Sequence, residues 1–111
     1  MRRKLIAANW KMNGALALVE SVCAALNNTV SSLPPKVEIL ICPPATLLKR
    51  FPKLANIALG GQDISAEAAG AYTGQLSAAL LQEAGASFTL VGHSDLWMHY
   101  ASCTYLALSA S

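Results

Sequence analysis

The sequence predicts an α/β fold of parallel βα units in the order β-α-β-α-β-α-β. Three observations predict it. Short apolar runs, typical of strands buried on both faces, alternate with segments of helical spacing. Polar side chains follow three of these runs, where parallel strands present their ligand-binding ends. Hydrophobic residues make up 54% of the 111 residues and charged residues 13%, which indicates a packed globular core.

The first half of the chain supplies two strands and two helices. The run KLIAAN at 4–9 predicts a strand. The Asn13-Gly14 pair ends this extended segment, and Asn13 is the expected N-cap of the first helix. The apolar face of that helix comprises Leu18, Val19, Val22, Cys23 and Leu26. The run VEILIC at 37–42 predicts the second strand. Pro44 then opens a short helix that runs to about Arg50, because the first helical turn needs no backbone donor there.

The second half supplies two more strands and one helix. The run IALG at 57–60 predicts the third strand. The polar segment 61–75 is too long for an ordinary βα connection, which indicates a functional or interface loop. Ser77 is expected to cap the next helix and Gly85 to end it. The run FTLVG at 88–92 predicts the fourth strand.

Two architectures fit this order of elements. An open doubly wound sheet is complete with four or five strands, whereas a (β/α)₈ barrel needs about 250 residues. In both, crossovers are right-handed and ligands bind at the carboxyl ends of the strands. The spacing of the elements leaves both architectures open.

Polar groups follow three strands at this predicted carboxyl edge. They are Asn9 and Lys11 after the first strand, Gln62 and Asp63 after the third, and His93, Ser94 and Asp95 after the fourth. The ammonium of Lys11 suits a phosphate or a developing oxyanion, and the alternative is a solvated loop lysine. The imidazole of His93 suits donation to a carbonyl oxygen, and the alternative is a structural histidine. Asp95 either pairs with Lys11 across a barrel mouth or caps a helix.

The composition argues against several classes of function. The net charge of +2 gives no electrostatic indication of nucleic acid, and no apolar stretch reaches the length of a membrane span. Zinc, nucleotide and serine-hydrolase motifs are absent from the sequence. The cysteines are far apart, so free thiols in a reducing cytosol are expected. They are Cys23, Cys42 and Cys103.

Five segments of the sequence resemble the triosephosphate isomerase family. They are ANWKMNG at 8–14, ICPPATLL at 41–48, LGGQDIS at 59–65, GAYTGQLSAALLQEAGAS at 70–87 and VGHS at 91–94. The resemblance is continuous over about residues 3–95. It implies that residues 1–95 are the N-terminal half of a TIM barrel, an incomplete half-barrel in this chain.

The resemblance implies an isomerase of glycolysis and gluconeogenesis. The family interconverts dihydroxyacetone phosphate and D-glyceraldehyde 3-phosphate by proton transfer through an enediolate, without a metal or cofactor, in the cytoplasm. His93 would be the electrophile, Lys11 would stabilise the phosphate and the enediolate, and Asn9 would help to bind the substrate. The family is homodimeric through its long third loop, here 62–76. The contact residues would be Tyr72, Thr73 and Gly74.

The sequence departs from the family at its C-terminal end. After VGHS the family usually continues Glu-Arg-Arg, whereas this chain has Asp95-Leu96-Trp97, and residues 96–111 form an uncharged tail that does not match the family. All formal charges lie within residues 1–95. The abrupt loss of charge suggests a frameshift, a mis-called gene end or an alternative exon. The coding DNA past codon 95 tests this hypothesis. The absence of a family-like continuation in every reading frame would contradict it.

The family's catalytic Glu has no counterpart in this sequence, so we expect a truncated chain that is inactive and aggregation-prone. A second interpretation is a non-catalytic half-barrel that pairs with another chain through residues 62–76. A third is an unrelated doubly wound domain that binds a phosphorylated ligand. A strand order other than 1-2-3-4 would favour the third interpretation.

Overall fold

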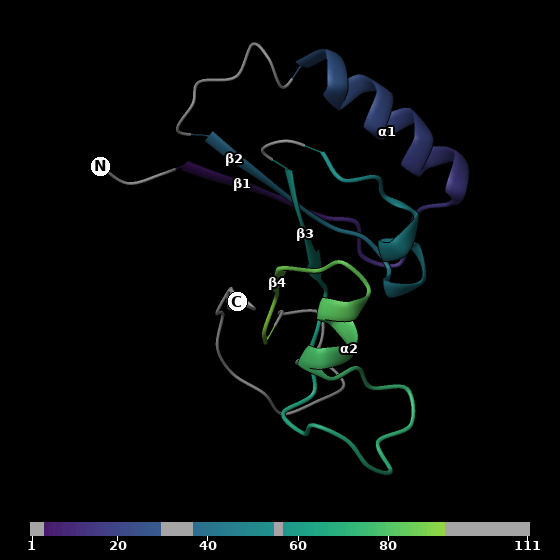
Figure 1. Ribbon diagram of the computed structural model, residues 1–111, viewed down its shortest axis with the longest axis vertical. Helices are drawn as coiled ribbons and strands as arrows, with labels where there is room; N and C mark the ends of the chain where they lie inside the picture. The colour runs from purple at the N-terminus through teal and green to yellow at the C-terminus, as the bar shows by residue number, and fades with distance from the viewer. Residues whose placement is uncertain (1–3, 30–36, 55–56, 93–111) are drawn as a thin grey trace.

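Four parallel strands form one curled sheet, in the order β1-β2-β3-β4, in the computed structural model of the chain (Figure 1). The structure describes residues 4–29, 37–54 and 57–92. The strands are β1 (Lys4–Asn9), β2 (Val37–Cys42), β3 (Ile57–Gly61) and β4 (Phe88–Thr89). The predicted parallel half-barrel is confirmed. The sequential order contradicts the doubly wound interpretation, because such a sheet reverses its strand order at a switch point.

The parallel register brings the carboxyl ends of the strands to one edge. Asn9 pairs with Cys42, Ile41 pairs with Leu59, and Gly61 pairs with Thr89. The chain segments that follow the strands therefore begin side by side. The polar groups that the sequence places after β1 and β3 belong to this edge.

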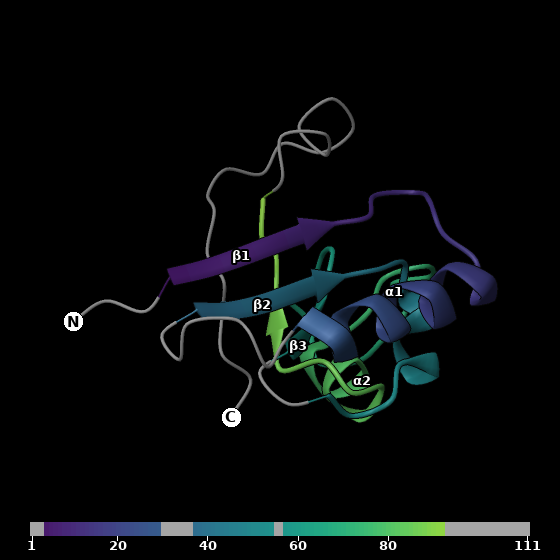
Figure 2. The same cartoon turned by 90° about the horizontal axis from the view of Figure 1, so that it is seen from above.

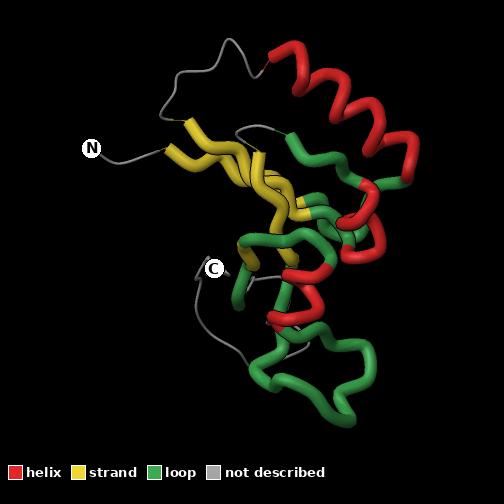
Figure 3. Tube along the Cα trace, viewed as in Figure 1, coloured by secondary structure: helices red, strands yellow, loops and turns green. Residues whose placement is uncertain are grey.

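The helices cover one face of the sheet. They are α1 (Leu16–Thr29), the 3₁₀ helix η2 (Ala45–Arg50) and α2 (Ala78–Glu83). Figures 2 and 3 show all three on the same side of the strands. Side chains of α1 pack against β2 and β3. This arrangement follows from right-handed βαβ crossovers, each of which returns the chain across the same face of a barrel sheet.

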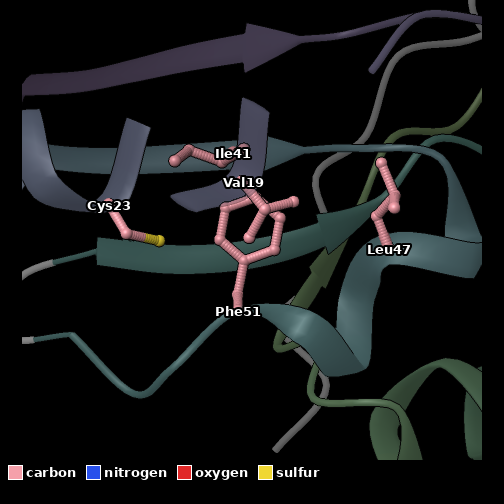
Figure 4. Packing of buried hydrophobic residues seen from close by; sticks show 5 residues of the cluster. All are labelled: Val19, Cys23, Ile41, Leu47 and Phe51. Atoms are coloured by element: carbon pink, nitrogen blue, oxygen red, sulfur yellow. The ribbon is translucent and has the colours of Figure 1, made fainter. Parts of the chain in front are cut away.

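The main hydrophobic core lies between α1, β2 and η2 (Figure 4). Its buried members are Val19, Cys23, Ile41, Leu47 and Phe51. Val22 and Leu26 of the predicted helical face also pack against this cluster, whereas Leu18 stays 42% exposed. Burial of one such side chain contributes about 1.5–3 kcal/mol, so this cluster fixes α1 against the sheet.

A smaller cluster holds α2 to the sheet. Leu48 of η2, Leu81 of α2 and Ala86 are buried together, and Leu59 of β3 packs against both this cluster and the main core. Gly61 completes the contact, because a Cβ atom there would lie 2.8 Å from Leu81 Cδ1. The close approach of α2 to β3 therefore depends on a residue without a side chain.

The first helix begins later than the sequence predicts. Asn13 is not its N-cap, because α1 starts at Leu16 and the carbonyl of Ala15 accepts the bonds from the backbone N–H groups of Leu18 and Val19. The Asn13 amide instead donates to the carbonyl oxygen of Trp10 at 3.0 Å. Its side chain thus stabilises the turn before the helix.

The other local predictions are confirmed, except that the second helix is of the 3₁₀ type and the fourth strand is shorter than predicted. Pro44 precedes η2, which ends at Arg50 but is a 3₁₀ rather than an α-helix. Ser77 caps α2 by accepting from the Leu80 N–H at 3.2 Å, and Gly85 has φ +107°. The fourth strand pairs over only two residues, although the Leu90 N–H still donates to the Gly61 carbonyl at 2.8 Å.

The predictions that concern His93, Ser94, Asp95, Cys103 and the tail at 96–111 lie outside the described residues. Within those residues, no helix combines the length and apolar character needed to cross a membrane.

Candidate active site

Asn9 and Lys11 form a compact unit at the carboxyl end of β1. The Lys11 backbone N–H donates to the Asn9 side-chain Oδ1 at 2.9 Å. Lys11 has φ +55° and is the one non-glycine residue of the described ranges with a left-handed backbone. The chain therefore turns sharply at Lys11, and the hydrogen bond that the Lys11 N–H donates to Asn9 stabilises this turn.

Gln62 joins this unit to the neighbouring strands. Its Nε2 donates to the Lys11 carbonyl at 2.7 Å and to the Cys42 carbonyl at 3.0 Å. Cys42 ends β2, and Gln62 directly follows β3. One half-buried amide thus connects the ends of three consecutive strands. Sequence reasoning placed Gln62 at this edge but gave it no role.

Trp10 anchors the turn to the core beneath it. Its backbone N–H donates to the Cys42 carbonyl at 3.0 Å, and its ring lies 5.5 Å from that of Phe51, tilted by 59°. Gly14 allows the chain to pass over this ring, because a Cβ atom there would lie 2.9 Å from Trp10 Cε3 and the residue has φ +120°. The residues before and after Lys11, Trp10 and Gly14, are therefore both fixed by contacts with the core or with the Trp10 ring.

The segment between β3 and α2 is a closed, self-supporting loop. Its base is joined by a bond from the Ser65 N–H to the Leu76 carbonyl at 2.8 Å. Its tip is a turn in which the Gln75 N–H donates to the Tyr72 carbonyl at 3.0 Å, with Gly74 at φ +86°. A positive φ at the third turn position defines a type II turn, which favours glycine there.

The loop lines a half-open pocket of about 480 Å³ next to the end of β3. Its lining includes Gln62, Asp63, Thr73 and Gln75, and Leu81 of α2 contributes apolar surface. The loop extends away from the sheet in Figure 1, in the part of the chain between β3 and α2. The residues at its tip, Tyr72, Thr73 and Gly74, are exposed, and their predicted role in an interface stays a prediction.

A family model described as "Triosephosphate isomerase" matches residues 4–102. This chain belongs to the triosephosphate isomerase family. The match ends past the boundary near residue 95 that the loss of charge indicated.

Individual triosephosphate isomerases agree with the family match. The enzyme of Ruegeria sp. (strain TM1040) is 49% identical over 96 residues, which cover 86% of this chain and 38% of the relative. The enzyme of Afipia carboxidovorans is 48% identical over 98 residues, covering 84% and 38%. The crystal structure of triosephosphate isomerase from Bartonella henselae has a TM-score of 0.74 and 42% identity, covering 91% of this chain and 42% of that one. The chain thus spans about two fifths of the length of these relatives.

Among the residues that the resemblance to triosephosphate isomerase implicates, the structure brings Asn9 and Lys11 together. The exposed Tyr72, Thr73 and Gly74 lie at the loop tip. His93 follows Gly92, the last described residue, so its position relative to Lys11 and that of Asp95 stay predictions. No group of three or more His, Cys, Asp or Glu residues that could hold a metal ion occurs within 4–29, 37–54 and 57–92.

The two cysteines of the described core are free and buried. Burial raises the pKa of the Cys42 thiol to about 11 and also raises the pKa of the Cys23 thiol. A raised pKa keeps a thiol protonated and weakly nucleophilic. Although Cys42 lies next to the site, it is suited to packing rather than to chemistry.

Proposed function

We propose that this chain carries the anion-binding half of a triosephosphate isomerase site. The observation that supports it is the arrangement of Lys11 at the carboxyl end of β1, with its backbone N–H bonded to Asn9 and its carbonyl to Gln62. A lysine ammonium at this edge suits the phosphate of a triose phosphate and the negative charge of an enediolate. The Asn9 amide group carries two further donors that suit a substrate oxygen.

In the proposed reaction, dihydroxyacetone phosphate and D-glyceraldehyde 3-phosphate interconvert through an enediolate. Lys11 stabilises the phosphate and the developing charge, and His93 polarises the carbonyl oxygen as a neutral imidazole. Asp95 supports this site, and the reaction requires no metal or cofactor. The setting would be glycolysis and gluconeogenesis in the cytoplasm, with a homodimer as the family's assembly.

The family's proton-transferring Glu is assigned to no residue of this sequence. We therefore expect the 111-residue chain to bind the phosphorylated substrate weakly and not to turn it over. Triose-phosphate turnover by the purified chain should equal that of a His93→Ala variant. Turnover well above that variant would contradict the proposal of an inactive chain.

Anion binding is tested separately from turnover. Inorganic phosphate should bind the wild-type chain and bind a Lys11→Met variant about tenfold more weakly, as expected for the loss of a charged hydrogen bond. Lys53→Met removes an exposed lysine away from the strand ends and serves as the matched control. Equal affinities for all three chains would contradict the proposed role of Lys11.

A second candidate function is association with another chain through residues 62–76. The loop tip favours it, because Tyr72 is 44% exposed on a preformed turn. Co-purification with a full-length triosephosphate isomerase would support this function. A Thr73→Asp variant should reduce the co-purified amount at least severalfold, whereas Ala24→Asp, at an exposed position of α1 outside this segment, should not.

A further inference from the structure

The backbone of Lys11 adopts a conformation that an L-residue does not hold by itself. At φ +55° the Cβ atom crowds the backbone, which is why residues other than glycine, asparagine and aspartate rarely occupy this region. The flanking residues Trp10 and Met12 are not glycines that would ease the turn. Contacts from outside the residue must therefore stabilise it.

Two side chains hold the peptide groups of Lys11. Asn9 Oδ1 accepts from its N–H at 2.9 Å, and Gln62 Nε2 donates to its carbonyl oxygen at 2.7 Å. The first contact is local, whereas the second joins residues that are 51 positions apart. The Gln62 contact therefore ties the conformation of Lys11 to a distant strand end.

Gln62 has the chemistry that this position needs. A primary amide nitrogen has two N–H groups, and Nε2 meets two carbonyl oxygens, those of Lys11 and Cys42. A flipped amide would direct an oxygen at both carbonyls and lose both bonds. A glutamate would do the same and add a negative charge, while a methionine would match the length but donate nothing.

We propose that Gln62 is a positioning residue, which fixes the left-handed backbone of Lys11 and so directs its ammonium into the anion site. This inference rests on the proposed function of Lys11. The bond to the Cys42 carbonyl fixes the position of the Lys11 turn relative to β2. Because Gln62 directly follows β3, the same side chain also fixes the turn relative to that strand. Lys11 thereby keeps a fixed position at the edge where the substrate phosphate would lie.

The positioning is measured on the full chain labelled with ¹³C,¹⁵N-lysine. The Lys11 signals are those that a Lys11→Arg variant removes. The intraresidue HN–Hα NOE, strongest at positive φ, reads the Lys11 backbone directly and without ligand. It should be strong in the wild type and lose at least half of its intensity in Gln62→Met and Gln62→Glu. Gln82→Met and Gln82→Glu make the same changes on the exposed face of α2 and should leave it unchanged.

The effect on the anion site is measured by titrating the chain with inorganic phosphate and monitoring the chemical shifts of Lys11. Loss of the two bonds should weaken phosphate binding about threefold to tenfold in the Gln62 variants and not in the Gln82 variants. If the wild-type chain does not bind phosphate, the proposed anion site is wrong, and the NOE still decides the role of Gln62.

Two results would overturn the assignment. One is an unchanged Lys11 NOE in Gln62→Met. The other is loss of the circular dichroism of the whole fold in both Gln62 variants, because Gln62 would then maintain the sheet generally rather than position one residue.

Discussion

Gly60 illustrates at the residue scale how tightly the strands pack below the site. A Cβ atom at this position would lie 2.8 Å from Cys42 Sγ and 3.1 Å from Leu40 Cδ1. Both neighbours are completely buried, so neither moves easily. We expect Gly60→Ala to lower the free energy of unfolding by about 1–3 kcal/mol, measured by urea titration with circular dichroism.

The double variant Gly60→Ala/Cys42→Ala tests the cause of this loss. Removing Sγ makes room for the new methyl group, so the double variant should lose less stability than the sum of the two single variants. A strictly additive result would show that the clash with Cys42 does not cause the destabilisation.

The thiol of Cys42 makes the stability depend on alkaline pH. Burial raises its pKa from 9.0 to about 11, so the unfolded chain releases the proton first. This contribution is fully present below pH 9 and is lost as the pH rises toward 11. The free energy of unfolding should fall over that interval by at most about 2 kcal/mol.

Cys42→Ala isolates this effect from the other titratable groups of the chain, including the buried thiol of Cys23. The variant keeps all those groups, so the difference in slope between the two chains belongs to Cys42. Equal slopes between pH 9 and 11 would contradict the assignment.

The same scale shows what the sequence could not supply about the site. Strand ends predicted that Asn9, Lys11 and Gln62 share one edge, and the structure confirms it. The left-handed backbone of Lys11 was not predictable, because its sequence neighbours carry no turn signal such as glycine at that position. The bond from Gln62 depends on register between strands, which no local pattern encodes.

At the scale of elements, helix α2 depends on a single cap. It has six residues, and the Ser77 hydroxyl accepts from the Leu80 N–H at its first turn. A short helix has few internal bonds, so its ends matter more. We expect Ser77→Ala to lower the free energy of unfolding by about 1 kcal/mol and Ser77→Gly by only a few tenths of that, measured by thermal unfolding.

The comparison of the two Ser77 variants separates capping from packing. Ser77 is buried, so a packing role would make glycine the more damaging replacement because it removes more atoms. A larger loss in Ser77→Gly than in Ser77→Ala would therefore contradict the capping role.

The sequence predicted the helices and strands whose bounds are marked by residues within or next to them. Apolar runs marked all four strands, Ser77 and Gly85 marked the bounds of α2, and Pro44 marked the start of η2. The start of α1 was wrong because Asn13 has an alternative partner in the Trp10 carbonyl. Asparagine is favoured both at helix caps and in turns because its side chain hydrogen-bonds to nearby backbone groups in each. The sequence alone does not distinguish the two roles.

At the scale of the whole molecule, the sheet is well packed at its centre and open at β1. Leu40 and Cys42 of β2 are fully buried, whereas Leu5 and Ile6 of β1 are 44% and 56% exposed. Among the described strands, β1 pairs with β2 alone. A flat apolar strand with one free edge is a template for pairing with another chain.

We therefore expect the isolated chain to self-associate through β1, and a charge on this strand should oppose it. Ile6→Lys replaces an exposed apolar side chain with a cation, as natural edge strands do. It should weaken self-association about tenfold in sedimentation velocity, because pairing would then have to bury the ammonium in place of the isoleucine. Leu80→Lys adds the same charge on α2, where Leu80 is 53% exposed, and should have little effect. If both variants weakened self-association equally, net charge rather than the β1 edge would be its cause.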